Sequence, residues 1–175
     1  MSLRLRSPFR LTRSALALGL AVSSFSPSAH AAPARPVYTI AVGVNTVADE
    51  LKREDGALST LRYADDDALK IYQYIGRAGR RAFLLSVLDP DTQRRFPGAA
   101  QHAKTPSLAE LERTVDAVVR AMARDRAAGE EPELVFFFSG HGVRDEIGGA
   151  SLSLLDGALT RSWLYERLLS RVPAR

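Results

Sequence analysis

The chain has 175 residues, of which 46% are hydrophobic, and this is enough for one domain with a packed core. Its 24 basic and 20 acidic residues give a formal net charge of +4, and it contains no cysteine. The composition therefore excludes disulfides, cysteine-ligated metal sites and a cysteine nucleophile within these residues.

The first 31 residues are expected to be a signal peptide. Four arginines form a basic leader, an apolar run covers residues 15–22, and Ala29-His30-Ala31 fits the small-residue pattern of a cleavage site. An apolar run of this length is too short to span a bilayer, which takes about 20 residues. We predict cleavage near Ala31 and export, either to the periplasm or as a secreted protein. A basic tail without a signal function is the alternative.

Removing this leader changes the charge of the chain. The leader holds four arginines and no acid, so the remaining part carries a net charge of 24 − 4 − 20 = 0. Binding to nucleic acid or to a membrane surface requires a persistent basic face. We therefore expect neither nucleic acid nor a membrane among the partners.

The part after the leader begins with a predicted linker, a strand and a helix. Residues 32–36 form the linker, and residues 37–42 are apolar and β-branched, as is typical of a buried strand. A helix is expected to start at the acidic residues 65–67 and to end at the glycines Gly76 and Gly79, because acids favour the first helical turn and glycine favours the end. Residues 83–88 predict a second strand.

The second half continues the alternation of strands and helices. Residues 90–106 contain three prolines and are expected to form a loop. The capping box Ser107-Leu-Ala-Glu110 predicts the start of a helix that continues to about residue 127. Residues 133–138 are continuously apolar after the first position and predict a third strand, buried on both faces.

The end of the chain predicts one short extended piece at residues 152–155 and a last helix capped by Thr160. Strands that alternate with helices indicate an α/β domain with a mostly parallel sheet. In such sheets, functional sites gather beyond the carboxyl ends of the strands. His141 lies at that position, directly after the third strand.

His141 is the strongest candidate for chemistry. Histidine suits proton transfer near neutral pH, and the N–H of the adjacent Gly142 could donate a hydrogen bond to a substrate carbonyl. A histidine that only caps a turn is the alternative. Ser139 does not fit a serine nucleophile elbow, because Phe137 replaces the first glycine of G-x-S-x-G. The histidines show no zinc-binding spacing, so no metal site is expected.

Four segments together resemble the caspase-like cysteine peptidases, most closely their bacterial caspase and metacaspase branch. The segments are YTIAVGVN, LRYADDDA, FFFSGHG and LSLLDGALT, and the similarity extends over residues 37–170. The resemblance implies a three-layer α/β/α fold for residues 37–175 and a cysteine-type endopeptidase activity. The expected partner is therefore a polypeptide substrate.

The resemblance also implies residue roles. His141 matches the base of a Cys–His dyad, and Gly142 matches the donor to the oxyanion. Asp67 and Ser139 match the residues that bind a basic P1 side chain, that is, the arginine or lysine before the cleaved bond. Ala64 stands where the family often has cysteine. For Asp67, the alternative is an ordinary acid in the first turn of a helix.

The family continues into a fourth strand that carries the cysteine nucleophile, and the 175 residues stop before it. The resemblance thus implies an incomplete sheet, in which residues 134–138 form an exposed apolar edge. We expect the N-terminal part of a peptidase domain that is not competent by itself. The alternatives are a non-catalytic caspase-like binding module and half of a split peptidase, completed by a second chain.

The resemblance implies no organic cofactor, and calcium is the one ion to consider. Calcium activates related metacaspases, and Asp65, Asp66, Asp145 and Glu146 offer oxygen ligands. Their spacing does not match a calcium-binding loop, so the question of calcium stays open.

Overall fold

The computed structural model describes residues 35–46, 60–79, 81–144 and 149–173. The chain divides into two compact units, Met1–Ala32 and Pro33–Arg175, and the description below concerns the second. The predicted signal peptide and most of the predicted linker lie outside the described residues. None of the helices in these ranges combines the length and the apolar character needed to cross a membrane.

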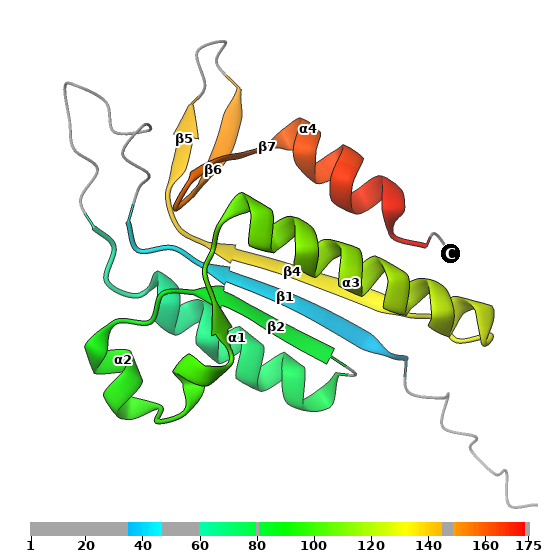
Figure 1. The fold of residues 1–175 in the computed structure, drawn as a ribbon, viewed down its shortest axis with the longest axis horizontal. Coiled ribbons are helices and arrows are strands. Elements are labelled where there is room, and N and C mark those ends of the chain that lie inside the picture. The colour runs from blue at the N-terminus through cyan, green and yellow to red at the C-terminus, as the bar shows by residue number, and fades with distance from the viewer. Residues whose placement is uncertain (1–34, 47–59, 80, 145–148, 174–175) are drawn as a thin grey trace, which may run out of the picture. The chain divides into compact units, whose positions relative to one another are not determined.

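Four parallel strands form the main sheet (Figure 1). They are β1 (Val37–Gly43), β2 (Arg81–Ser86), β3 (Ala103–Lys104) and β4 (Glu133–Ser139), in the order β3-β2-β1-β4. Each is joined to the next by a crossover that contains helical structure, as parallel strands require. The prediction of an α/β domain with a parallel sheet is confirmed.

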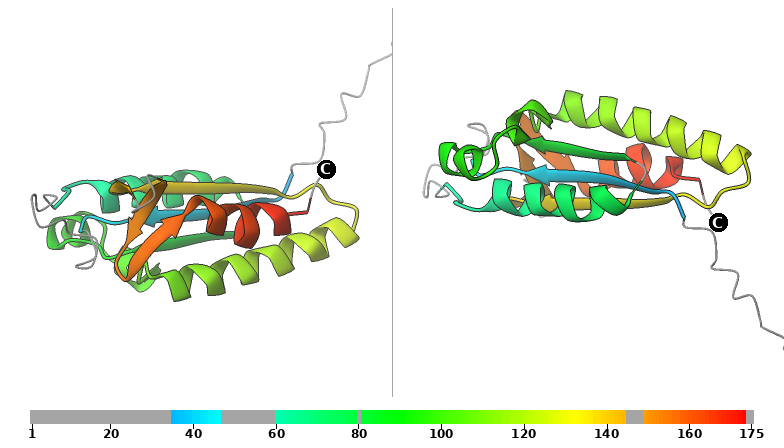
Figure 2. Two further views of the ribbon diagram at one scale, coloured as in Figure 1. Left: turned by 90° about the horizontal axis from the view of Figure 1, so that it is seen from above. Right: turned by 90° about the horizontal axis from the view of Figure 1, so that it is seen from below.

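Helices cover both faces of this sheet, as Figure 2 shows. One face packs against α1 (Ala64–Ala78) and the other against α3 (Leu108–Ala127). Successive side chains of β1 alternate between the two cores, because a strand has a period of two. Ile40 and Val42 belong to the core under α3, and Ala41 belongs to the core under α1. The result is a three-layer α/β/α arrangement.

The predicted capping box of α3 is present in the structure. The hydroxyl of Ser107 accepts a hydrogen bond from the N–H of Glu110 at 3.2 Å. The apolar stripe of α3 then enters the core, as the helical period predicts. Its buried members are Leu111, Val115, Val118, Ala121 and Met122.

The prediction of a loop at residues 90–106 is wrong for most of this segment. It contains α2 (Pro90–Arg95), a 3-10 turn (Ala99–Gln101) and the short strand β3. The side chain of Asp89 accepts a hydrogen bond from the N–H of Thr92 at 2.7 Å, and Pro90 occupies the first helical position. Proline is favourable there, because its lost N–H is one that the helix start leaves unpaired.

The predicted end of α1 at its glycines is confirmed for Gly79, which caps the helix after Ala78, whereas Gly76 lies inside the helix. Gly76 serves a packing role instead. A Cβ at this position would lie 2.7 Å from the Cβ of Ala82, so glycine allows α1 to approach β2 closely.

A second, antiparallel sheet follows β4, where only one extended piece was predicted. It consists of β5 (Gly142–Arg144), β6 (Ala150–Leu154) and β7 (Gly157–Thr160) in the order β5-β6-β7. The chain then enters α4 (Arg161–Trp163), which continues in helical turns through Arg171. The hydroxyl of Thr160 accepts from the N–H of Trp163 at 3.1 Å, so the predicted cap is confirmed.

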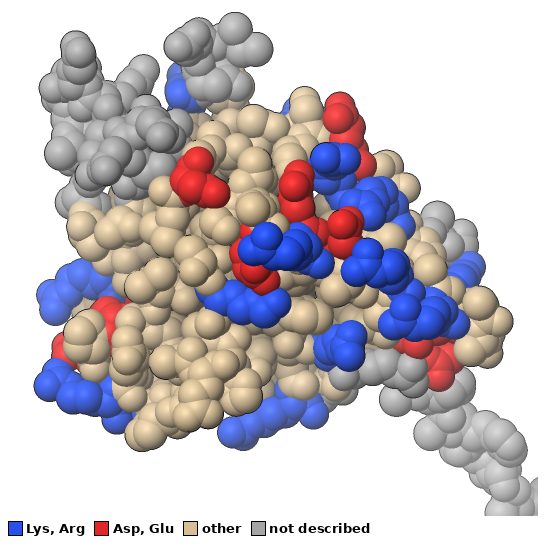
Figure 3. All heavy atoms as spheres, in the orientation of Figure 1, with Lys and Arg blue, Asp and Glu red and all other residues tan. Residues whose placement is uncertain are grey.

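Ion pairs connect the C-terminal helical turns to α3. Arg171 lies 2.7 Å from Asp116, and Arg167 lies 3.5 Å from Glu112. The hydrogen bond from Arg171 lowers the pKa of Asp116 below its ordinary value. Figure 3 shows acidic and basic side chains interspersed over this face of the molecule. Both signs of charge are therefore present on this face.

Strand β4 lies at an edge of the main sheet. Among the described residues it pairs only with β1, in the register Val42 to Phe138 and Gly43 to Ser139. All seven of its residues are half-buried, although five of them are large and apolar. The sheet thus presents an apolar edge with unpaired backbone groups, which is a surface able to accept another strand.

Candidate functional site

The site begins where β1 and β4 end next to each other. Gly43 is the last residue of β1 and lies opposite Ser139 of β4. A Cβ at Gly43 would overlap the carbonyl oxygen of Ala64 and lie 2.7 Å from the Cβ of Ala68. Glycine therefore lets the first turn of α1 pack directly on the strand. This close packing brings the acids of that turn to the carboxyl ends of the strands.

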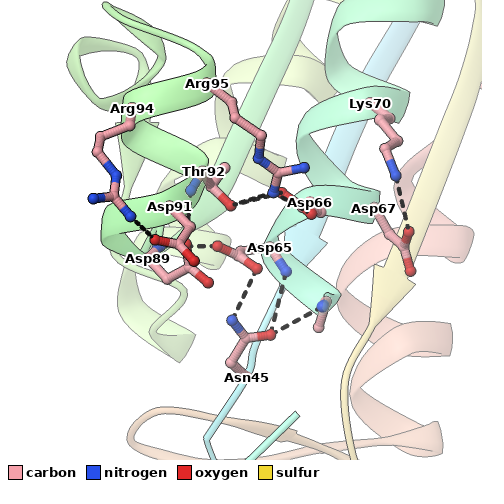
Figure 4. Close-up of polar contacts among 11 residues, drawn as sticks. Asn45, Asp65, Asp66, Asp67, Lys70, Asp89, Asp91, Thr92, Arg94 and Arg95 are labelled. Carbon is pink, nitrogen blue, oxygen red and sulfur yellow. Dashed lines mark hydrogen bonds and ion pairs between the residues drawn. The ribbon is translucent and has the colours of Figure 1, made fainter. Parts of the chain in front are cut away.

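Asn45 fixes the start of α1 (Figure 4). The residue at the N-cap position, Tyr63, makes no capping hydrogen bond with its side chain. The Oδ1 of Asn45 accepts a hydrogen bond from the N–H of Ala64 at 2.9 Å, and its Nδ2 donates to the carboxylate of Asp65 at 2.8 Å. Asn45 thus acts as a cap supplied from a distant part of the chain.

Asp65 and Asp66 are buried and structural. Asp65 also accepts a hydrogen bond from the backbone N–H of Asp89 at 2.9 Å, which connects α1 to the segment after β2. Asp66 accepts from the hydroxyl of Thr92 at 2.6 Å and from the guanidinium of Arg95 at 2.6 and 2.8 Å. The first turn of α1 is therefore held both by Asn45, which follows β1, and by residues of α2.

The ionisation of Asp66 reflects these contacts. Burial alone would raise the pKa of its carboxyl group, but the hydrogen bonds from Thr92 and Arg95 outweigh burial and lower the pKa below its ordinary value. Asp66 is therefore a charged, paired carboxylate at neutral pH, and its charge is used within the protein.

Asp67 differs from its two neighbours because it is accessible, with 49% of its side chain exposed. Figure 4 shows it pointing away from Asp65 and Asp66. The hydroxyl of Ser139 donates to its Oδ2 at 3.4 Å, and the ammonium of Lys70 lies 4.0 Å from its Oδ1. The structure therefore brings together Asp67 and Ser139, which the sequence analysis selected as one pocket.

Gly140 lets the chain turn sharply after Ser139. A Cβ at Gly140 would lie 2.7 Å from the ring of Phe138 and 3.2 Å from the carbonyl oxygen of Val44. The backbone N–H of Val44 donates to the carbonyl of Ser139 at 2.9 Å and anchors the end of the strand. The position of the following His141 is thus defined by backbone contacts on both sides of the turn.

The N–H of Gly142 points to the outside of the small sheet. The carbonyl oxygen of His141 accepts from the N–H of Ser153 at 2.9 Å, so these two residues form a hydrogen-bonded pair. Such pairs alternate with non-bonded pairs in an antiparallel ladder, and Gly142 opposite Leu152 is the next pair. The N–H of Gly142 is consequently directed away from β6, at the edge of the sheet, where a ligand could accept its hydrogen bond.

Side chains able to hold a metal do not gather in the described parts of the chain, where no group of three or more histidines and acids has a suitable arrangement. Of the four oxygen donors considered for calcium, Asp65 and Asp66 are engaged with protein donors. Asp145 and Glu146 lie outside the described residues.

The sequence analysis missed the polar residues that support the site. Asn45, Thr92 and Arg95 contact the first turn of α1 from two other segments. One signal was present in the sequence, since an aspartate followed by proline, as at Asp89 and Pro90, is typical of a helix start. No comparable pattern marks Asn45.

No protein-family model, no curated protein and no solved structure matches the chain. The assignment of a function therefore depends on the geometry of these residues and on the resemblance of their motifs.

Proposed function

We propose that this chain carries the base, the oxyanion donor and the substrate pocket of a caspase-like cysteine endopeptidase that cleaves after arginine or lysine. The observation that carries the proposal is the contact between Asp67 and Ser139, two side chains 72 positions apart. One belongs to the first turn of α1 and the other ends β4. Together they form an accessible acidic site at the end of β4, two residues before His141 in the sequence.

The chemistry of this pair suits a cationic side chain. A carboxylate beside a hydroxyl offers several acceptor oxygens, and a guanidinium can bind both oxygens of a carboxylate at once. Lys70 occupies the neighbourhood of Asp67 at 4.0 Å, too long for a hydrogen bond. An arginine or lysine of a substrate would replace this weak contact with a shorter one.

His141 and Gly142 would act on the bond after that basic residue. The imidazole accepts the proton of a thiol, the thiolate attacks the carbonyl carbon, and the imidazolium then protonates the leaving amine. The N–H of Gly142, directed away from the sheet, donates to the oxyanion that forms. The thiol is not among the 175 residues, so we assign it to a polypeptide segment that adds to the open edge of β4.

A non-catalytic binding module is the second candidate. It is favoured by the fact that the pocket residues and their supports are assembled without any cysteine in the sequence. Such a module would bind basic residues of a partner through Asp67 and Ser139, and His141 would have no contact with the ligand.

The test is a titration of the protein with acetylated dipeptide amides that end in arginine or in aspartate, monitored by NMR. We expect the arginine peptide to bind and the aspartate peptide not to bind. Asp67→Asn should weaken arginine binding about tenfold or more, because a charged hydrogen bond contributes about 1.5–3 kcal/mol. The matched control is Asp91→Asn, which removes an exposed acid on α2 and should leave binding unchanged.

The same titration separates the two candidates. If His141 faces the reacting bond, arginine peptides will shift its imidazole resonances, and a module without catalytic geometry will leave them unchanged. Equal binding of the arginine and aspartate peptides, or wild-type affinity in Asp67→Asn, would contradict the proposed pocket.

A further inference from the structure

A second concave site lies on the small sheet, between β5–β7 and the first turns of α4. Its volume is about 430 Å³, within the range of small-ligand pockets. Its principal lining residues are Gly142, Arg144, Leu152, Leu159, Arg161 and Leu164. We call these six residues the β5–α4 pocket. Of these residues, only Gly142 has a role in the proposed function, through its backbone N–H.

The strand register explains why this pocket is apolar. Gly142 is opposite Leu152, and Leu152 is opposite Leu159, so the three positions share one face of the sheet. Leu159 is fully buried, Leu152 is half-buried, and Leu164 closes the pocket from α4. A Cβ at Gly142 would meet only one atom within 4 Å, the carbonyl oxygen of Ser151 at 3.9 Å. The glycine thus leaves open space beside Leu152.

Two arginines supply the formal charge of the described lining. Arg144 and Arg161 are both exposed, and among the residues that the structure describes no acid lines the pocket. Within the described part of the chain neither arginine forms an ion pair, and the guanidinium of Arg161 lies 5.5 Å from the centre of the Tyr165 ring. An apolar floor with a cationic rim is complementary to a group that is apolar and carries a negative charge.

We propose that the β5–α4 pocket is a second subsite of the peptide-binding site and takes a bulky apolar side chain next to a carboxylate. This inference rests on the proposed function, because it assigns the pocket to the same polypeptide that places a basic side chain at Asp67. The connecting residue is Gly142, which lines the pocket and follows Ser139 by three positions. The preferred ligand thus combines a basic residue with an apolar–acidic pair.

The first experiment is an NMR titration of the ¹⁵N-labelled full chain with N-acetyl-Phe-Glu-amide and N-acetyl-Phe-Gln-amide. We expect shifts at the amides of Gly142, Leu152 and Leu159, and an affinity for the Glu peptide about fivefold to tenfold higher, since two partly exposed cations face one carboxylate. The double variant Arg144→Gln/Arg161→Gln should remove this preference. The control Arg77→Gln/Arg81→Gln, at the opposite end of the sheet, should keep it.

The second experiment links the two subsites. Peptides that join arginine to Phe-Glu through glycine spacers of increasing length should include one that binds more tightly than either part alone, because linked ligands gain effective concentration. Asp67→Asn should weaken this linked peptide and leave N-acetyl-Phe-Glu-amide unaffected. If no spacer gives a gain, the pocket is not part of one site with Asp67 and the inference is overturned.

The outcomes also separate this inference from the proposed function. Binding of Phe-Glu at the pocket without binding of arginine peptides at Asp67 would contradict the proposed function and leave the pocket as an independent site. Equal affinities for the Glu and Gln peptides, or shifts spread over the surface, would refute the pocket's specificity. Shifts of the pocket amides that depend on protein concentration alone would assign the pocket to a second copy of the chain.

Discussion

Asn45→Ala is the substitution that tests most directly how the site is supported. The side chain of Asn45 accepts from the N–H of Ala64 and donates to the buried carboxylate of Asp65. Alanine removes these interactions, together with a longer contact from the N–H of Asp65 to the Oδ1 of Asn45 at 3.4 Å, and creates no steric conflict. The start of α1 loses the side-chain cap that Asn45 supplies, and one carboxylate oxygen of a fully buried acid loses its donor.

The expected cost is the sum of these two losses. Loss of an N-terminal cap costs about 1 kcal/mol, and a buried acceptor without its partner costs about 1–3 kcal/mol. Asp65 keeps the N–H of Asp89 at 2.9 Å, so the lower part of that range applies. We expect the free energy of unfolding to fall by about 2–3 kcal/mol.

The assay is urea unfolding at pH 7, followed by far-UV circular dichroism and by the fluorescence of the single tryptophan, Trp163. Thr46→Ala is the control, because Thr46 is the exposed neighbour of Asn45 and should change stability by less than about 0.5 kcal/mol. Arginine-peptide affinity should also fall in Asn45→Ala, because Asp67 lies in the turn that Asn45 holds. A variant indistinguishable from Thr46→Ala would refute this account of the helix start.

Three other predictions follow from the same contacts. Gly43→Ala should lower the free energy of unfolding by about 3 kcal/mol or more, since its Cβ would lie 2.7 Å from that of Ala68, whereas Gly142→Ala should leave the thermal midpoint unchanged. Asp66→Asn should cost about 1–3 kcal/mol at pH 7. The folded pKa of Asp66 lies below its ordinary 3.8, so this difference should persist down to about pH 4 and shrink only at lower pH, in urea titrations across pH. Arg171→Gln removes an exposed ion pair and should not change the urea midpoint measurably.

The elements predicted correctly from sequence are those that depend on nearby residues. Strand β1 follows from a run of apolar and β-branched residues, and the start of α3 follows from Ser107 and Glu110, three positions apart. The helix α2 was missed because three prolines were taken as evidence for a loop. Pro90 stands at the first helical position, where proline is favourable. The position of Pro90 directly after the cap Asp89 therefore predicts a helix, and the number of prolines in the segment does not exclude one.

The small sheet and the supports of the site were harder to predict. Strands β5, β6 and β7 have only three to five residues each and include glycine and serine, so their periodicity is too short to recognise. Asn45 meets Asp65 across 20 positions, and Arg95 meets Asp66 across 29. These contacts depend on how whole helices and strands pack together. The pattern of neighbouring residues in the sequence does not reveal this packing.

The order of strands in the main sheet has a consequence for how the protein folds. Pairing β1 with β2 joins residues about 43 positions apart, such as Val42 and Leu85, whereas pairing β1 with β4 joins Val42 and Phe138, which are 138 − 42 = 96 positions apart. A doubling of the closed loop adds only about 0.6 kcal/mol of entropy cost, but such distant pairings slow folding.

During synthesis, β1 emerges first and must keep its second edge free until β4 has been made. The contact between Asp67 and Ser139 can form only in that last pairing step, because Ser139 is the final residue of β4. The contact between Asp67 and Ser139 therefore forms late in the assembly of the main sheet, and a nascent chain without β4 would leave the second edge of β1 unpaired.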